Sequence, residues 1–186
     1  MKLTVPSELA DITIEQYKRL AELDLDTDDT SWVVEAICIL CELQADDVQR
    51  LPLRDIERIA EVIKRLNDPN QNNQPLQTRI DYKGVRYGFH PNLSKLTVGE
   101  FADVETYCKD GFFNNLTQVM SILYRPIKEE HGEFYTIEDY SGARLDNHWD
   151  GLKMNIVMGA VNFFLSIGVN LTKDSPNYLR VGGAKT

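Results

Sequence analysis

Residues 80–92 read IDYKGVRYGFHPN, and this stretch decides the fold class. On both sides of a Lys-Gly pair, apolar side chains alternate with polar or small ones, at Ile80, Tyr82, Val85, Tyr87 and Phe89. A period of two is the pattern of a half-buried strand, and Gly84 supplies the positive φ that a tight turn needs. The stretch therefore predicts a β-hairpin near 78–89, which ends at His-Pro-Asn.

Upstream of the hairpin the hydrophobic period is 3.6, and it predicts three helices, over 14–23, 31–43 and 53–66. The first begins with a capping box, in which Thr13 caps the helix and Gln16 reaches back to it. The third carries charged residues on one face and an apolar stripe on the other, formed by Ile56, Ile59, Ala60, Ile63 and Leu66.

Downstream of the hairpin the pattern returns to helices, over 97–109, 115–123 and 152–171. Thr97 and Glu100 form a second capping box, and the Arg125-Pro126 pair ends the helix before it. Aromatic residues between 133 and 140 predict a short extended arm. The expected fold is mainly α (α+β), with about six helices and one small hairpin.

The segment 67–77, NDPNQNNQPLQ, is polar and contains two prolines, so it is the best linker candidate. It separates an N-terminal helical part, 1–66, from a hairpin plus helical part, 78–174. The two parts are expected to form one domain or two packed halves. Residues 175–186 are expected to be a flexible tail.

Composition limits the classes of function. The 186 residues carry a net charge of -9, so a basic nucleic-acid footprint is missing and no nucleic-acid partner is expected. The most apolar run, 156–171, falls short of the roughly 20 residues that cross a bilayer, so no membrane partner is expected either. Three cysteines cannot close a disulfide framework, which indicates a reducing compartment, and the first ten residues do not resemble a signal peptide.

One acidic loop has the spacing of a calcium site. Asp24, Asp26, Asp28 and Glu35 occupy positions 1, 3, 5 and 12 of the loop used by calcium-binding helix–loop–helix proteins, where oxygen ligands surround a hard cation. Position 6, however, is Asp29 instead of glycine. The alternative is an acidic loop that caps the following helix, and no metal site is assigned.

The remaining reactive residues show no catalytic pattern. Cys38 and Cys41 form a CxxC inside an apolar helical stripe with no second pair of ligands, which favours two packed side chains over a zinc site. The three histidines lie in separate loops, and no nucleophile or phosphate-loop motif occurs. We therefore expect no catalytic residue, no cofactor and no enzymatic activity.

Aromatic residues are concentrated in the second half of the chain. A two-stranded hairpin is marginal by itself, so it must pack on a helix or offer a surface to another chain. Tyr82, Tyr87 and Phe89 are the interface candidates. The alternative is that the hairpin only covers the core.

Several motifs carry a family resemblance over residues 6–171. They are DITIEQYKRL at 11–20, GVRYGFHPNLSKLTVGEFADVETY at 84–107, LTQVMSILYRPI at 116–127, FYTIEDYSG at 134–142 and MNIVMGAVNFFLSIG at 154–168. The chain resembles a group of small proteins encoded in tailed-bacteriophage genomes near virion structural and assembly genes. The resemblance implies a role in virion morphogenesis, as a tail assembly chaperone or a minor virion component. The implied partners are other phage proteins or a second copy, in the host cytoplasm or the virion.

Two other classes of function stay open from the residues alone. One is a calcium-dependent helix–loop–helix binding module at the acidic loop. The other is an enzyme whose site the sequence does not reveal.

Overall fold

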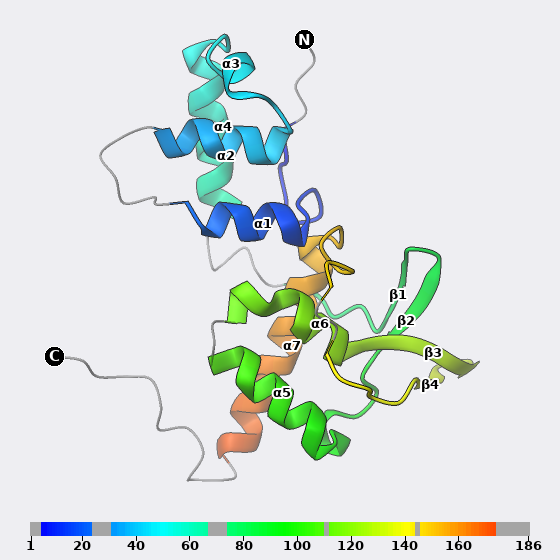
Figure 1. Ribbon diagram of the computed structural model, residues 1–186. Helices are drawn as coiled ribbons and strands as arrows, with labels where there is room; N and C mark the ends of the chain where they lie inside the picture. Colours follow the sequence, from blue (N-terminus) through cyan, green and yellow to red (C-terminus); the bar gives the residue numbers. More distant parts are fainter. Residues whose placement is uncertain (1–4, 24–30, 67–73, 110–111, 144–145, 174–186) are drawn as a thin grey trace, which may run out of the picture.

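A computed structural model describes residues 5–23, 31–66, 74–109, 112–143 and 146–173. Within these residues the chain has an α+β fold, with seven α-helices, two 3₁₀ helices and one four-stranded antiparallel sheet (Figure 1). The helices are α1 (Ile14–Ala21), α2 (Ser31–Cys41), α3 (Ala45–Val48), α4 (Leu53–Leu66), η2 (Leu93–Lys95), α5 (Val98–Lys109), η3 (Phe112–Asn115), α6 (Leu116–Leu123) and α7 (Met154–Lys173). The strands are β1 (Arg79–Tyr82), β2 (Val85–Phe89), β3 (Tyr124–His131) and β4 (Phe134–Ile137). No described helix combines the length and the hydropathy needed to cross a bilayer.

Both predicted capping boxes are confirmed. At α1 the amide of Gln16 donates to Thr13 Oγ1 at 3.2 Å, and the amide of Thr13 donates to Gln16 Oε1 at 3.0 Å. At α5 the amide of Glu100 donates to Thr97 Oγ1 at 3.2 Å, and the amide of Thr97 donates to Glu100 Oε2 at 2.6 Å. Each box satisfies helix-terminal amides that would otherwise lack acceptors.

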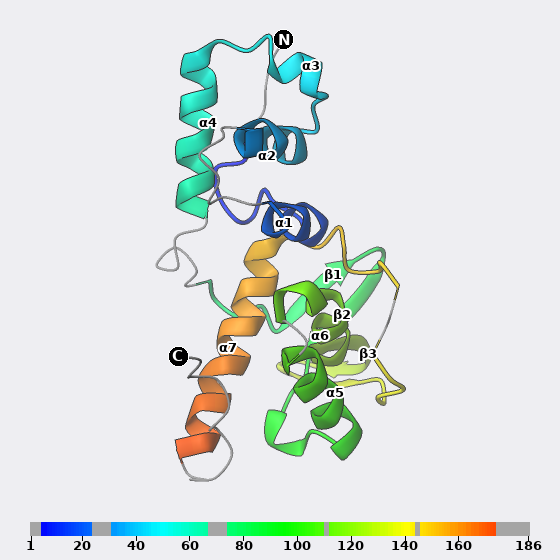
Figure 2. The same cartoon turned by 60° about the vertical axis from the view of Figure 1, so that its left-hand side comes forward.

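The N-terminal helices follow the predicted pattern, with one addition. Helix α4 has the predicted bounds, but α2 ends at Cys41 because Glu42 adopts a left-handed φ of 55°. The short helix α3 then forms where the prediction had a loop. In both views α2, α3 and α4 lie on the far side of α1 from α7 (Figures 1 and 2).

The predicted hairpin is confirmed, but it is half of a larger sheet. β1 and β2 pair antiparallel with Tyr82 opposite Val85, and Lys83 and Gly84 both have positive φ, as in a type I′ turn. The strand β3, which the sequence pattern did not predict, pairs with β2 and then with β4, so the sheet order is β1-β2-β3-β4. The predicted extended arm is β4.

Strand β3 pairs with β2 through Tyr124, Arg125 and Pro126 and with β4 from Ile127 onward, and the β3–β4 register is irregular between Ile127 and Glu129. Tyr135 of β4 reaches the backbone of the first hairpin. Its hydroxyl donates to the carbonyl of Phe89 on β2 at 2.6 Å and to that of Thr78, just before β1, at 3.1 Å. Gly88 makes this approach possible, because a Cβ there would lie 2.4 Å from the Tyr135 ring.

The two parts of the chain share one core. Buried side chains of α1, α2, α4, the sheet, α6 and α7 form a continuous cluster, in which Trp149 and Tyr124 are the largest fully buried members. The start of α7 is fastened to α1 by an isolated bridge between Thr13 and Lys153 and by the amide of Met154, which donates to the carbonyl of Ile12 at 2.8 Å. Residues 67–73 of the predicted linker and the predicted tail, 175–186, lie outside the described residues.

Candidate functional site

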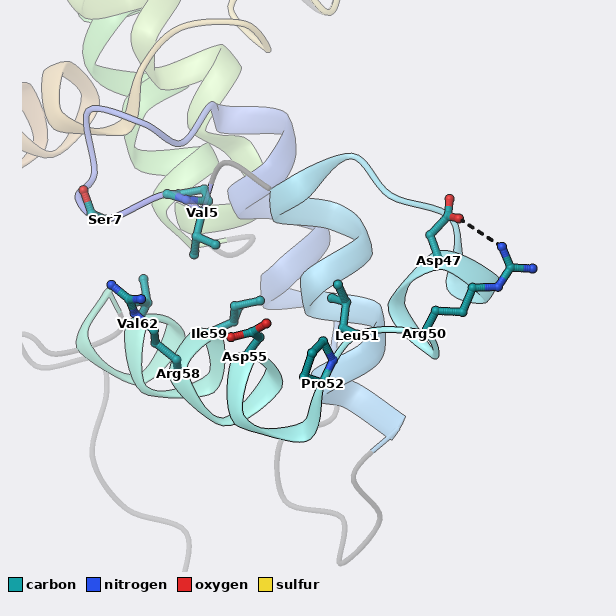
Figure 3. A pocket seen from close by; sticks show the side chains of 11 residues that line it. Val5, Ser7, Asp47, Arg50, Leu51, Pro52, Asp55, Arg58, Ile59 and Val62 are labelled. Atoms are coloured by element: carbon teal, nitrogen blue, oxygen red, sulfur yellow. Dashed lines mark ion pairs between the residues drawn. The ribbon is translucent and has the colours of Figure 1, made fainter. Parts of the chain in front are cut away.

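A groove of about 860 Å³ lies between the N-terminal segment, α3 and α4 (Figure 3). Its apolar lining consists of Val5, Pro6, Leu51, Pro52, Ile59 and Val62. Charged and polar side chains complete the lining, at Ser7, Asp47, Arg50, Asp55 and Arg58. An apolar floor with a few polar groups at its edge is the usual composition of a binding groove, and the volume lies within the range of ligand pockets.

Local hydrogen bonds hold the N-terminal wall of the groove. Asp11 Oδ2 accepts from the amides of Ser7 at 2.8 Å and Glu8 at 3.2 Å, and also from the Ser7 hydroxyl. The Ser7 amide is the main cause that lowers the pKa of Asp11 below its ordinary value, since it stabilises the carboxylate. Lys153 Nζ ties the same turn to α7 by donating to the Asp11 carbonyl at 2.9 Å.

The opposite wall is shaped by the turn between α3 and α4. The amide of Leu51 donates to the carbonyl of Val48 at 3.0 Å, and the amide of Asp55 donates to that of Pro52 at 2.9 Å. Pro52 stands just before α4, where a missing N–H costs nothing. The turn places Leu51 and Pro52 against the groove while Ile59 and Val62 close its floor from α4 (Figure 3).

Among the described residues, some charged side chains at the groove have an ion-pair partner and one does not. Asp47 lies 3.9 Å from Arg50, and Asp55 lies 4.0 Å from Arg54, so each carboxylate has a guanidinium nearby. Arg58 makes no ion pair with any other described residue. The groove therefore suits an apolar segment that also brings one carboxylate to Arg58.

A second polar cluster is buried between β2, α5 and β3. Arg125 Nη2 lies 2.7 Å from Glu100 Oε1, and His90 Nε2 lies 3.7 Å from the same oxygen, while Glu100 is 1% exposed. Burial is the main cause that lowers the pKa of His90. Burial opposes ionisation of Glu100, but the amide and hydroxyl of Thr97 and the guanidinium of Arg125 outweigh it and lower the pKa of Glu100. A neutral histidine and a charged Glu–Arg pair make this a structural anchor for the start of α5.

The predicted interface residues lie mainly inside the protein. Tyr87 and Phe89 are 5% and 2% exposed, so the prediction that they contact a partner is wrong; the hairpin covers the core instead. Tyr82 is half-buried, and its ring stacks on Trp149 at a centroid distance of 5.4 Å. The reason is that Trp149 packs on Tyr82 and Tyr87, while Tyr124 and Phe163 pack on Phe89, so side chains from distant segments cover the face that the local pattern left open.

The calcium candidate is not placed by the structure. Asp24, Asp26 and Asp28 lie outside the described residues, and Glu35 is exposed on α2. Within the described parts, no group of three His, Cys, Asp or Glu side chains could hold a metal ion. Burial raises the pKa of Cys38, Cys41 and Cys108, which favours their neutral thiols.

Sequence reasoning missed both the groove and the buried cluster. The groove combines residues from 5–7 with residues from 47–62, and no local pattern links those segments. Glu100 was identified as a capping residue, but its pairing with Arg125 depends on the unpredicted strand β3. Comparison with protein-family models, with curated proteins and with solved structures gave no match.

Proposed function

We propose that this chain is a virion morphogenesis protein of a tailed bacteriophage, and that it acts by protein–protein contact without catalysis. The resemblance at residues 84–107 and 116–127 supports the phage assignment. The groove supports the mode of action, and it is the observation that carries the proposal, because it offers an apolar floor with charged edges on one described face.

The partner is expected to insert a segment with apolar side chains. Leu51, Ile59 and Val62 would contact that segment, and Arg58 would receive its carboxylate. A guanidinium binds a carboxylate through two parallel hydrogen bonds, which adds geometric specificity to the apolar contact. The groove is thus the docking site of a tail assembly chaperone or of a minor virion component.

A matched pair of charge reversals tests the contact. Arg58→Glu changes a groove residue, whereas Arg54→Glu makes the same change on the same helix outside the groove lining. Both side chains are exposed, so both variants should fold, as circular dichroism would verify. In the phage that encodes the chain, we expect Arg58→Glu to lower the yield of infectious particles at least tenfold and Arg54→Glu to leave it near wild type. Equal yields would refute the groove as the docking site.

Mass spectrometry separates the two roles within the proposal. A chaperone should be abundant in infected lysate and missing from purified virions, whereas a virion component should be present at a fixed copy number. Deletion of the coding sequence without any loss of infectious particles would overturn the morphogenesis role itself.

A further inference from the structure

The sheet ends in β4, an edge strand with one side open. β4 pairs with β3, and the order β1-β2-β3-β4 leaves the other side of β4 without a strand among the described residues (Figure 1). Main-chain N–H and C=O groups along such an edge can pair with a further strand. This edge is separate from the groove, and the proposed function does not use it.

The register shows which main-chain groups of β4 face outward. The hairpin turn is two residues long, so Phe134 and then Thr136 direct their N–H and C=O groups toward β3. The amide of Glu138 continues this alternation by donating to a carbonyl of β3 at 2.9 Å. Tyr135 and Ile137 therefore direct their N–H and C=O groups away from β3, and these groups make no hydrogen bond with any other described residue.

The sequence of β4 favours the pairing of a further strand. Its residues, Phe-Tyr-Thr-Ile at 134–137, all belong to types that are enriched in strands. Exposed edges are normally protected by a charge or a proline on the strand itself, and β4 has neither, whereas the other edge strand, β1, carries Arg79 and Asp81. Phe134 is 81% exposed, so its ring is free to contact a side chain of an added strand.

Carboxylates flank β4 at both ends. Glu133 precedes the strand, Glu138 and Asp139 follow it, and all three side chains are exposed. Asp139 pairs with Lys128 at 2.9 Å, whereas Glu133 and Glu138 make no ion pair with any other described residue. A strand that carries lysine or arginine near its ends therefore complements the charge of this edge.

The same carboxylates disfavour a second copy of the chain as the occupant. The antiparallel register that pairs all the outward groups of both copies sets Tyr135 opposite Ile137, and it then sets Glu133 opposite Asp139. Like charges directly opposite one another destabilise a strand pair, and each copy has a net charge of -9.

We propose that the free edge of β4 binds an extended segment of a partner protein, in which apolar side chains lie between basic residues. The segment adds a strand to the sheet by pairing its main chain with Tyr135 and Ile137. One of its apolar side chains contacts Phe134, and its basic residues lie beside Glu133 and Glu138.

Capped peptides and ¹⁵N-labelled protein test this proposal. The basic probe is Lys-Val-Thr-Val-Thr-Lys, the acidic probe has glutamate in place of both lysines, and the methylated probe is the basic one with N-methyl groups on its inner amides. The basic probe should shift the amide signals of Tyr135 and Ile137 saturably and slow their hydrogen exchange, because their N–H groups gain acceptors. It should bind at least about fivefold more tightly than the acidic probe, as two exposed ion pairs predict, and the methylated probe should not bind.

Four results would overturn the proposal. The basic probe could leave the two amides unmoved, bind no more tightly than the acidic probe, or bind equally well when methylated. The fourth is exchange at these amides that slows with protein concentration alone, because a second copy would then occupy the edge.

Two double variants separate the charges beside β4 from the net charge of the chain. Glu133→Lys with Glu138→Lys reverses the charges that flank the strand. Glu57→Lys with Glu61→Lys makes the same change in net charge at exposed positions of α4. We expect the β4 variant to bind the acidic probe more tightly than the basic one, and the α4 variant to keep the wild-type preference.

The same response in both double variants would show that net charge alone attracts the probe, and would refute the assignment. All four substitutions replace exposed side chains, so both variants should fold, as circular dichroism would verify. If either does not fold, the titrations of the wild-type protein decide.

Discussion

Gly88→Ala should destabilise the protein, although within a strand alanine is normally more stable than glycine by about 0.5–1 kcal/mol. The added Cβ would lie 2.4 Å from Cε2 and 2.7 Å from Cδ2 of the Tyr135 ring, and 3.0 Å from Cγ2 of Ile137. Carbon atoms pack at about 3.5–4.0 Å, so the ring must withdraw by about 1 Å.

The displacement of the Tyr135 ring sets the size of the expected loss of stability. The Tyr135 hydroxyl donates to carbonyls at 2.6 Å and 3.1 Å, and a shift of this size breaks that shared hydrogen bond, at a cost of about 1 kcal/mol. Overpacking adds about 1–3 kcal/mol. The free energy of unfolding should therefore fall by about 2–4 kcal/mol in urea titrations followed by circular dichroism.

Two further variants isolate the cause. Gly99→Ala, at an exposed position of α5 where the added Cβ meets no neighbouring atom within 4 Å, should be neutral or stabilise by up to about 1 kcal/mol. In a Tyr135→Ala background the two ring contacts are gone and only the 3.0 Å contact with Cγ2 of Ile137 remains, so Gly88→Ala should cost less than about 1 kcal/mol there. The same cost in both backgrounds would refute the reasoning, as would a Gly88→Ala variant as stable as wild type.

Three other perturbations follow from the buried contacts. Glu100→Gln leaves the buried guanidinium of Arg125 without a counter-charge and should lower the free energy of unfolding by about 3–5 kcal/mol. Glu105→Gln, which removes an exposed ion pair with Lys109 on the same helix, should lower it by less than about 0.5 kcal/mol. Similar losses for the two variants in urea titrations would contradict the argument from burial. The free energy of unfolding should be highest above pH 6.5 and decline toward pH 4. The reason is that the folded-state pKa values of His90 and Glu100 lie below their ordinary values, so the unfolded chain binds the additional protons as the pH falls. An unfolding free energy that does not change over this range would count against the prediction. Gly159→Ala should destabilise the protein by about 1–3 kcal/mol, since the added Cβ would lie 2.4 Å from the backbone oxygen of Pro75. A rise in melting temperature would show that α7 does not contact the segment around Pro75 at this position.

Prediction from the sequence worked where the deciding contacts lie within a few residues of one another. The Thr13–Gln16 and Thr97–Glu100 boxes span three residues each, so their spacing was sufficient to locate two helix starts. The Lys83-Gly84 turn joins its strands directly, so the hairpin near 78–89 could be located from the local alternation. The bounds of α4 could be predicted because its apolar stripe and its charged face repeat at helical spacing.

Tertiary structure decided what depends on distant partners. Gly88 and Tyr135 meet only because β3 pairs both with β2 and with β4. Rings from distant segments, those of Trp149, Tyr124 and Phe163, bury Tyr87 and Phe89, which the local pattern left free for a partner. The groove likewise needs residues 5–7 beside α4, and the buried pair needs Glu100 beside Arg125. The alternation within a strand predicts that one face is buried, but it does not predict which segment buries it. That depends on which long-range contacts bury the most apolar surface while leaving the backbone N–H and C=O groups hydrogen-bonded.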